Sequence, residues 1–338
     1  MSRTGVEPKP PWRAVPAAVR LGVHEALGAA VSRAARVWGG YGPTPTFRLR
    51  LTDGRRAFFK ASWPQSDEFA RDAWTREERV YRELADVIRP WAPAFYASFQ
   101  LGGWRVLLLE DTGPRSVPPW TPALASRVMH AFAAFHHATL GIRLPAWIPR
   151  GALGLGHGGR LSTWEPDVEA LRPMAGLAGA RAEEAFRWLE TSAPSLTGAS
   201  RLAADPLGPQ AFLHGDTRSD NLRWARGRLR LLDWPSVSVG PPEDDVAMLA
   251  QSIAAEGGPE PERLVAWYRQ RVPLRPEAMD AAVARTARFF ADQAWRPPVP
   301  GLPRLRPFQR RQLRVTLSWT AMRLGLPEPT WLQAPGFL

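Results

Sequence analysis

The chain has 338 residues, with 44 Lys and Arg residues against 32 Asp and Glu residues, and its formal net charge at pH 7 is +12. It contains no cysteine, which excludes disulfides, a thiol nucleophile and a cysteine-ligated metal centre. No uncharged apolar run approaches the roughly 18 residues of a membrane span, and the first residues do not resemble a secretory signal. We therefore expect a cytoplasmic globular protein of about two domains.

The first third of the chain predicts two helices and two β-hairpins. In chain order these are a helix over Ala14–Val37, hairpin strands over Thr46–Thr52 and Arg55–Ala61, a helix over Asp67–Asp86, and hairpin strands over Ala94–Gln100 and Trp104–Leu109. Apolar residues at helical spacing indicate the helices. Asp53-Gly54 and Gly102-Gly103 are favoured hairpin turns. These elements predict a small mixed sheet with one long helix.

After Gly113 the sequence becomes rich in Ala, Leu and Arg. Thr121 is placed to cap a helix that runs to about Leu140, and most of the remaining chain has helical character. Short strands return over Ala211–Leu232. We therefore predict an α+β protein, with a small β-rich N-terminal lobe over residues 1–113 and a larger, mainly helical C-terminal lobe over residues 114–338.

Three polar side chains are predicted to converge at one end of a short β-ribbon. Asn221, the only asparagine in the chain, lies five residues after Asp216 and twelve residues before Asp233. Arg226-Gly227 predicts a two-residue hairpin turn, which places Asn221 opposite Leu232 and beside Asp233. Oxygen ligands in this arrangement suit a hard cation such as Mg²⁺, although single Asp and Asn residues also occupy ordinary turns.

The segment His214-Gly215-Asp216-x-x-x-x-Asn221 resembles the catalytic loop of the aminoglycoside phosphotransferase and choline kinase family, whose members are related to the protein kinases. Leu232-Asp233, followed twelve residues later by Asp245, resembles the second motif of that family. The resemblance implies a bilobal protein-kinase-like fold and an enzyme that transfers a phosphoryl group from ATP or GTP, with Mg²⁺, to a small-molecule hydroxyl. It implies that Asp216 is the general base, that Asn221 and Asp233 hold Mg²⁺, and that Asp245 supports the loop.

The chain is rich in arginine and contains only two lysines, Lys9 and Lys60. A lysine kept in such a chain suggests a role that arginine cannot fill, so Lys60 is a candidate for contact with the nucleotide phosphates. A two-residue turn at Asp53-Gly54 would place Lys60 opposite Phe47, on the face that carries Leu49. Phosphoryl transfer in kinase-like folds uses a cation held by a helix carboxylate, and lysine supplies a compact point charge. A strand-end lysine that extends its ammonium into solvent is the alternative.

Other residues of the N-terminal lobe complete the expected nucleotide site. Glu77 lies on the inward stripe of its predicted helix and is the expected partner of Lys60, with Glu78 as the second candidate. A solvent-exposed position is the alternative for either carboxylate. Gly39 and Gly40 can form a turn over the phosphates, but no G-x-G-x-x-G-x-V pattern accompanies them, so a plain turn is equally compatible with the sequence.

The resemblance also implies roles for the residues that join the lobes and for the catalytic loop. Glu110 and Thr112 lie in a segment similar to the family's hinge, where backbone groups contact the purine. Arg218 lies two residues after Asp216, where many protein kinases carry a lysine on the transferring phosphate; an exposed loop arginine is the alternative. His214 is expected to order the loop.

The charge of the C-terminal region bears on the phosphate acceptor. No acidic residue occurs between Gln293 and Pro327, and seven arginines lie there beside aromatic residues. In the family that the sequence resembles, the C-terminal helices build the acceptor pocket, and polycationic aminoglycosides would need carboxylates there. A neutral or anionic acceptor is therefore favoured, with possible exceptions at Glu243, Asp244, Glu256 and Asp292.

Two alternative functions remain open. One is a degenerate kinase that binds nucleotide without catalysis. The other is a nucleic-acid-binding protein, because arginines interleaved with aromatic residues can contact phosphates and stack on bases. The arginines are dispersed through the whole chain and no nucleic-acid-binding motif is present, so the small-molecule kinase is the favoured reading. The sequence predicts no oligomeric state.

Overall fold

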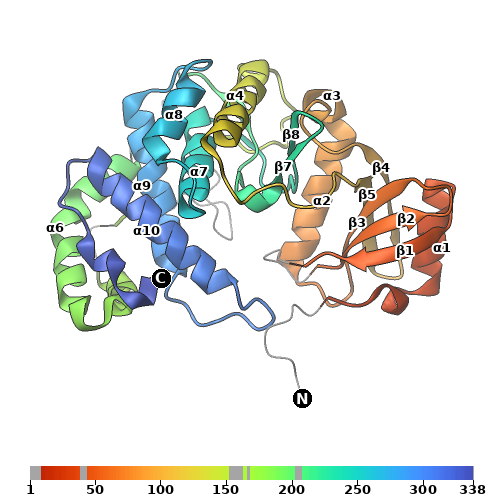
Figure 1. Cartoon of the computed structure of the whole chain (residues 1–338), viewed down its shortest axis with the longest axis horizontal. Coiled ribbons are helices and arrows are strands. Elements are labelled where there is room, and N and C mark those ends of the chain that lie inside the picture. The colour runs from red at the N-terminus through yellow and green to blue at the C-terminus, as the bar shows by residue number, and fades with distance from the viewer. Residues whose placement is uncertain (1–8, 39–43, 152–162, 166–167, 202–207, 338) are drawn as a thin grey trace. The chain divides into compact units, whose positions relative to one another are not determined.

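The computed structural model describes residues 9–38, 44–151, 163–165, 168–201 and 208–337 (Figure 1). The chain forms two compact units, which we describe separately. The first unit combines Met1–Ser116 with Leu222–Pro235 and Val299–Arg304, and the second unit combines Val117–Asn221 with Ser236–Pro298 and Leu305–Leu338. The predicted lobes, 1–113 and 114–338, follow chain order, whereas the first unit also takes in a short hairpin from late in the sequence.

A five-stranded sheet forms the centre of the first unit, with strand order β1-β2-β3-β5-β4 (Figure 1). The strands are β1 Val31–Arg36, β2 Thr46–Leu51, β3 Arg56–Ser62, β4 Phe95–Leu101 and β5 Trp104–Glu110. Both predicted hairpins are confirmed. The prediction of a mixed sheet is wrong, because every neighbouring pair of these strands is antiparallel.

The predicted helix over Ala14–Val37 is also wrong in its second half. Helix α1 covers only Ala17–Leu27, and Gly28 ends it with a φ of 67°. The residues that follow form β1, which pairs with β2 from Val31↔Leu51 onward. Pairing with β2 gives the backbone of this segment hydrogen-bond partners at the sheet edge, and this outweighs the apolar pattern from which a helix was predicted.

The β2–β3 hairpin differs from its predicted register by one residue. The loop contains three residues rather than two, because the amide of Leu51 donates to the Arg55 carbonyl oxygen at 2.9 Å. Gly54 takes the left-handed position of this loop, with a φ of 86°. Lys60 therefore pairs with Thr46, and the predicted pairing with Phe47 is wrong.

The two faces of the sheet have different neighbours. One face packs against α1 in a shared core that includes Val19, Val23, Phe47, Leu49, Phe59, Val106 and Leu108. Lys60 and its cross-strand partners Thr46 and Leu107 alternate with these residues and belong to the opposite face. Helix α2, Glu68–Glu83, contacts strands β3 and β5. The corrected register therefore removes Lys60 from the α1 core.

Helix α2 begins and ends close to the predicted positions. The side chain of Asp67 caps it by accepting a hydrogen bond from the Ala70 amide at 2.8 Å. The helical path is interrupted at Leu84, and a short helix α3 covers Ala85–Ile88. The prediction of a helix over 67–86 is therefore confirmed, with a break near its end.

The second unit is mainly helical, as predicted. Its helices are α4 Pro122–Thr139, α5 Arg172–Ala175, α6 Ala182–Arg201, α7 Pro242–Ala255, α8 Pro261–Arg269, α9 Pro276–Gln293 and α10 Leu305–Arg323 (Figure 1). Thr121 caps α4 through the Leu124 amide at 3.2 Å, which confirms the predicted start of that helix. Helix α7 is buried over most of its length and packs against α8, α9 and α10. None of the helices that the structure describes is both long and apolar enough to cross a membrane.

Four short strands lie in the region between α6 and α7. Strand β6, Ala211–Leu213, pairs with β9, Ser238–Gly240, in the second unit. Strands β7, Leu222–Ala225, and β8, Arg228–Leu231, form the hairpin that belongs to the first unit. The β7–β8 pairing starts at Ala225↔Arg228, so the register predicted from the two-residue turn is confirmed.

Candidate active site

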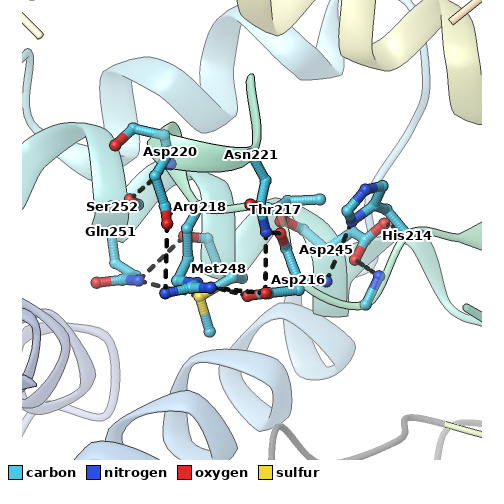
Figure 2. Close-up of polar contacts among 12 residues, drawn as sticks. His214, Asp216, Thr217, Arg218, Asp220, Asn221, Asp245, Met248, Gln251 and Ser252 are labelled. Carbon is cyan, nitrogen blue, oxygen red and sulfur yellow. Dashed lines mark hydrogen bonds and ion pairs between the residues drawn. The ribbon is translucent and has the colours of Figure 1, made fainter. Parts of the chain in front are cut away.

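Asp245 of α7 holds the loop that carries Asp216. Its Oδ2 atom accepts a hydrogen bond from the His214 amide at 2.7 Å, and its Oδ1 atom accepts one from the Gly215 amide at 2.9 Å. The Thr217 hydroxyl donates to the Asp245 carbonyl oxygen at 2.8 Å. Figure 2 shows Asp245 and Thr217 together beside the loop. These contacts confirm the prediction that Asp245 supports the loop.

The loop is further fixed by a glycine and two histidines. A Cβ atom at Gly215, whose φ is 77°, would lie 2.1 Å from the Ser236 carbonyl oxygen, so only glycine fits this close approach. The Asp216 amide donates to Nδ1 of His214 at 3.3 Å, which agrees with the expected ordering role of that histidine. Buried His136 lies 3.3 Å from Oδ2 of Asp245 through Nε2 and 2.6 Å from the Tyr268 hydroxyl through Nδ1.

The carboxylate of Asp216 is held by two neighbouring side chains (Figure 2). Arg218 forms a two-point contact with it, from Nε to Oδ1 at 2.6 Å and from Nη2 to Oδ2 at 2.8 Å. The Asn221 amide nitrogen donates to Oδ2 and to the Asp216 carbonyl oxygen, both at 2.9 Å. A carboxylate offers about four lone-pair positions, so Oδ1 keeps one for a further hydrogen-bond donor. These two hydrogen bonds use the amide nitrogen of Asn221, and its amide oxygen is a ligand type that a hard cation such as Mg²⁺ accepts.

Arg218 is directed at the predicted base rather than at a separate anion. Its guanidinium carbon lies 5.6 Å from the ring centre of Phe308 on α10, and its Nη1 atom is 3.8 Å from Oδ2 of Asp220. The side chain is only 16% exposed, which does not fit the alternative of an exposed loop arginine. The expected contact with a transferring phosphate stays a prediction. Phe308 belongs to the C-terminal region in which arginines lie beside aromatic residues, and this pattern was the only sequence signal for it. The pattern could not predict that Phe308 lies against Arg218.

Lys60 makes two short ion pairs within the first unit. Its Nζ atom lies 2.5 Å from Oε2 of Glu77 and 2.6 Å from Oδ1 of Asp233. Glu77 is almost completely buried and also accepts a hydrogen bond from the Trp234 amide at 3.4 Å. The ion pair between Lys60 and Glu77 is therefore present, whereas Glu78 bonds to Arg82 at 3.0 Å. The solvent-exposed alternative for Lys60 is wrong, because its ammonium is held between two carboxylates and its side chain is only 18% exposed.

The electrostatics of this cluster favour a charged lysine. Burial acts to lower the pKa of Lys60, but the charges of Asp233 and Glu77 outweigh it and raise the pKa well above its ordinary value. Burial raises the pKa of Glu77, and the charge of Lys60 offsets only part of this effect. Lys60 therefore remains protonated throughout the physiological pH range.

Asp233 has a backbone conformation that is uncommon for its residue type. Its φ is 67°, in the left-handed region that Asp and Asn enter more readily than other non-glycine residues. The residue follows β8 after Leu232, and buried Trp234 anchors the next position by donating from Nε1 to the Leu231 carbonyl oxygen at 3.0 Å. Asn221 is the last residue of this part of the second unit and Asp233 lies in the first, so the shared Mg²⁺ site stays a prediction.

The remaining predicted nucleotide-site residues fall into two groups. Gly39 and Gly40 lie outside the described residues. Glu110 ends β5, and its carboxylate accepts a hydrogen bond from the Ala94 amide at 3.2 Å. Thr112 lies in the connection that follows, beside Asp111, whose Oδ1 atom accepts from the Gly113 amide at 3.0 Å. The contribution of these residues to purine binding stays a prediction.

One buried residue near Lys60 was not assigned a role from the sequence. The ammonium of Lys9 donates to the Val37 carbonyl oxygen at 2.9 Å and to the Thr46 hydroxyl at 3.1 Å. Thr46 is the cross-strand neighbour of Lys60, so both lysines of the chain lie near the same corner of the sheet. The scarcity of lysine was the signal that could have identified this residue.

Comparison with known proteins agrees with the geometry of the catalytic loop. The model of the phosphotransferase enzyme family matches residues 33–278, which is more than half of the chain. The chain belongs to the phosphotransferase enzyme family. The predicted family and enzyme class, a small-molecule kinase, are therefore confirmed. No protein of curated function matches the sequence at a significant level.

Solved structures of this family show the same fold. A thermostable mutant of aminoglycoside phosphotransferase APH(4)-Ia is 16% identical, with a TM-score of 0.55 over 90% of this chain and 97% of that one. Spectinomycin phosphotransferase APH(9)-Ia is 12% identical, with a TM-score of 0.54 over 87% of this chain and 93% of that one. A protein provisionally named as a fructosamine-3-kinase from Thermobifida fusca is 24% identical, with a TM-score of 0.51 over 88% of this chain and 98% of that one. The predicted kinase-like fold is therefore confirmed.

Proposed function

We propose that this phosphotransferase is a Mg²⁺- and nucleotide-dependent kinase of a small-molecule hydroxyl. The observation that carries the proposal is the fixed carboxylate of Asp216. Arg218 and Asn221 orient it and occupy most of its lone pairs, and Oδ1 keeps one position for a donor. A hydroxyl that donates to Oδ1 would be oriented for attack on the γ-phosphorus of the nucleotide. As its oxygen bonds to phosphorus, the bond from phosphorus to the leaving nucleoside diphosphate would break and the hydroxyl proton would pass to Oδ1.

The other residues of the site would bind the nucleotide and the metal ion. Lys60, held by Glu77, is suited to contact the nucleotide phosphates as a permanent point charge. Asn221 and Asp233 would hold Mg²⁺, which when bound neutralises charge on the phosphates, and their oxygen atoms are the ligand type that this ion prefers. Glu110 and Thr112 lie in the segment that resembles the family's hinge, where backbone groups would contact the purine. The choice between ATP and GTP depends on backbone contacts in that connection.

The neighbouring structures support a nucleotide and a small hydroxyl acceptor. Aminoglycoside phosphotransferase APH(4)-Ia was solved with ADP and hygromycin B, and spectinomycin phosphotransferase with ADP and spectinomycin. For this chain we favour a neutral or anionic acceptor. Of the four carboxylates that could have served an aminoglycoside, Asp244 and Asp292 are bound to Arg285 and Arg288. The other two accept hydrogen bonds, Glu243 from a backbone amide and Glu256 from Trp120.

A panel of small alcohols, screened by release of nucleoside diphosphate, is the experiment that tests the proposal. The wild-type protein and Asp216→Asn would be compared by single-turnover phosphate transfer and by nucleotide titration. A positioned base contributes about 10²–10⁴-fold in rate, so transfer by Asp216→Asn should fall by about that factor while nucleotide affinity changes little. Undiminished transfer would remove Asp216 from the mechanism.

A nucleotide-binding protein without catalysis is the second candidate, because Arg218 occupies both oxygens of the base. In that case Mg²⁺ and ATP together would raise the unfolding temperature, but no acceptor would be phosphorylated. Mg·ATP would fail to stabilise a pure nucleic-acid-binding protein. The two measurements therefore separate all three functions.

A further inference from the structure

The loop that carries Asp216 is held at both ends of helix α7. Asp245, in the first turn of this helix, accepts hydrogen bonds from two backbone amides that precede Asp216. Glu256, at the C-terminal end of the same helix, holds the loop after Asp216. Its Oε1 atom accepts a hydrogen bond from the Ser219 hydroxyl at 2.5 Å. One buried helix therefore fixes the loop on both sides of the predicted base.

Ser219 is held through both its side chain and its backbone. It is almost completely buried, and its amide donates to the Ser252 hydroxyl oxygen at 3.2 Å. Ser252 and Glu256 both belong to the last turn of α7, so the two contacts of Ser219 reach the same end of one helix. In Figure 2, Ser252 and Asp245 lie on opposite sides of the loop residues. A buried hydroxyl that lost its acceptor would carry an uncompensated desolvation cost.

Both oxygens of the Glu256 carboxylate accept hydrogen bonds. Oε2 accepts from Nε1 of buried Trp120 at 2.9 Å, and Trp120 lies directly before Thr121, the cap of α4. Hydrogen bonds to a charged acceptor are roughly twice as strong as those between neutral groups. A negative charge is unfavourable at the C-terminal end of a helix, so the stability of α7 does not explain a glutamate here. The contacts with Ser219 and Trp120 do.

The end of α7 gives Glu256 a rigid base. The Gly258 amide donates to the Ile253 carbonyl oxygen at 3.0 Å, which turns the chain back onto the helix directly after Glu256. A Cβ atom at Gly258 would lie 2.5 Å from Cγ2 of Ile253, so this turn is closely packed. A side chain can position another group only if it is itself held in place. Glu256 meets this condition through the turn and through Trp120.

Ser219 lies between the two residues that contact Asp216. Arg218 precedes it, and Asn221 ends the short helix Ser219–Asn221. The backbone amide of Asn221 donates to the Arg218 carbonyl oxygen at 3.0 Å, which closes one turn around Ser219. The side chains of Arg218 and Asn221 both donate to the carboxylate of Asp216. The anchoring of Ser219 therefore fixes the turn that carries both contacts.

We propose that Glu256 is a positioning residue of this phosphotransferase. It acts through Ser219 and fixes the part of the loop that carries Arg218 and Asn221. The proposal rests on the proposed function, in which Asn221 binds Mg²⁺. A loop released from Glu256 would still be held by Asp245, but Asn221 would occupy its ligand position for a smaller fraction of the time. The apparent affinity for the ion would fall with that fraction.

Hydrogen exchange of the ligand-free protein tests the contact itself. Ser219→Ala and Glu256→Ala each remove the hydrogen bond to the loop. Glu262→Ala is the matched control, because Glu262 also accepts from a tryptophan, Trp319, at 2.7 Å, but lies on α8. Exchange at the amides of residues 219 and 221 should become roughly tenfold faster in both loop variants, since one charge-assisted hydrogen bond is lost. The control should exchange there as the wild type does.

The response to Mg²⁺ separates positioning from a merely structural contact. Thermal unfolding with ATP, and separately with GTP, would be followed as Mg²⁺ is added, each variant being compared with its own Mg²⁺-free baseline. The Mg²⁺ concentration that gives half of the stabilisation should rise roughly tenfold in Glu256→Ala and in Ser219→Ala. The double variant should show no further rise, because both changes remove the same contact. Glu262→Ala should respond as the wild type does, whatever its unfolding temperature.

Three results would overturn the proposal. They are unchanged exchange at residues 219 and 221 in Ser219→Ala, equally fast exchange in Glu262→Ala, or a wild-type Mg²⁺ response in both loop variants. If Glu256→Ala does not fold, Ser219→Ala decides the question, because it removes a single oxygen atom. Failure of the proposed function gives a different result. The wild type would then show no Mg²⁺ response with either nucleotide, while faster exchange in Ser219→Ala would keep Glu256 as the residue that fixes the loop.

Discussion

At the scale of single residues, the position of Lys60 between two carboxylates explains why a lysine persists in a chain that otherwise uses arginine. A guanidinium is planar and longer, and it could not place one nitrogen within 2.6 Å of both Glu77 and Asp233 without repacking. Removal of this cation would leave buried Glu77 beside Asp233. We expect Lys60→Met to lower the free energy of unfolding at neutral pH by about 3 kcal/mol, as for other broken buried pairs.

The difference in free energy of unfolding between the wild type and Lys60→Met should depend on pH, and this dependence can be predicted from the raised pKa of Lys60. The unfolded chain releases this proton near pH 10.4, whereas the folded protein holds it to higher pH. The stability that Lys60 contributes is therefore complete below about pH 10.4 and is lost as the pH rises through the folded pKa. Urea unfolding of the wild type and Lys60→Met should show a constant difference from about pH 7 to 9 and a smaller one above about pH 10.5. A difference that grows with pH would contradict this assignment.

Asp233 provides a second test at the residue scale. Asn is the suitable replacement because it also tolerates the left-handed backbone, and it removes the charge that a cation would need. Asp233→Asn should lose the extra thermal stabilisation that Mg²⁺ adds to bound nucleotide. The substitution also removes one of the two charges that pair with Lys60, so its unfolding temperature without ligand should fall, and the Mg²⁺ effect is measured relative to that lower baseline. Glu78→Gln in the same unit is the control and should respond to Mg·ATP as the wild type does. A normal Mg²⁺ response from Asp233→Asn would exclude Asp233 as a ligand.

At the scale of elements, the catalytic loop depends on the backbone conformation of its glycine. In Gly215→Ala the new Cβ would meet a backbone oxygen at 2.1 Å in addition to the unfavourable φ, so the loop could not keep its place against Ser236. We expect a loss of at least about 3 kcal/mol in the free energy of unfolding, together with loss of activity.

Gly54→Ala is the matched control for that substitution. Gly54 also has a positive φ, 86°, but a Cβ there would have no neighbour within 4 Å. Its cost should be the conformational term alone, about 1–2 kcal/mol. Urea unfolding of the two variants measures the difference, and equal losses would show that the approach to Ser236 has no energetic consequence.

At the scale of the whole molecule, the first unit is not continuous in sequence. The β7–β8 hairpin joins it through hydrogen bonds from the Leu231 amide to the Trp91 carbonyl oxygen at 2.7 Å and from Arg230 to the Pro90 carbonyl oxygen at 2.9 Å. Asp233 reaches Lys60 from the same segment. An N-terminal fragment cut at Ser116 would therefore lack part of its own structure.

This discontinuity predicts the behaviour of two fragments. Residues 1–116 alone should be less stable than the same residues joined by a Gly/Ser linker to residues 222–235. The added segment brings buried apolar residues, each worth about 1.5–3 kcal/mol before the cost of chain ordering, so a net gain of about 2 kcal/mol is expected. Urea unfolding followed by tryptophan fluorescence measures the gain. Equal stability of the two fragments would show that the hairpin does not stabilise the sheet.

The sequence by itself determined the features that depend on a few neighbouring residues. The Arg226-Gly227 turn fixed the register of its hairpin, and Thr121 fixed the start of α4. Asp216 was predicted to lie next to Asn221, and the two side chains do meet, because only five residues separate them along the chain. These predictions succeeded because turn geometry, helix capping and short chain connections are local.

Only the tertiary structure decided the contacts that join distant parts of the chain. Residues 31–36 became a strand because β2 was available as a partner, and the β2–β3 loop took three residues, which moved Lys60 to the pairing with Thr46. Asp233, which is 173 residues from Lys60 in the sequence, is its second ion-pair partner. Arg218 contacts Asp216, the predicted base, and lies against the ring of Phe308. The free energies of such long-range contacts and of the local alternatives differ by only a few kcal/mol. Burial and charges from distant parts of the chain therefore decide which conformation forms, and these are not apparent from local sequence patterns.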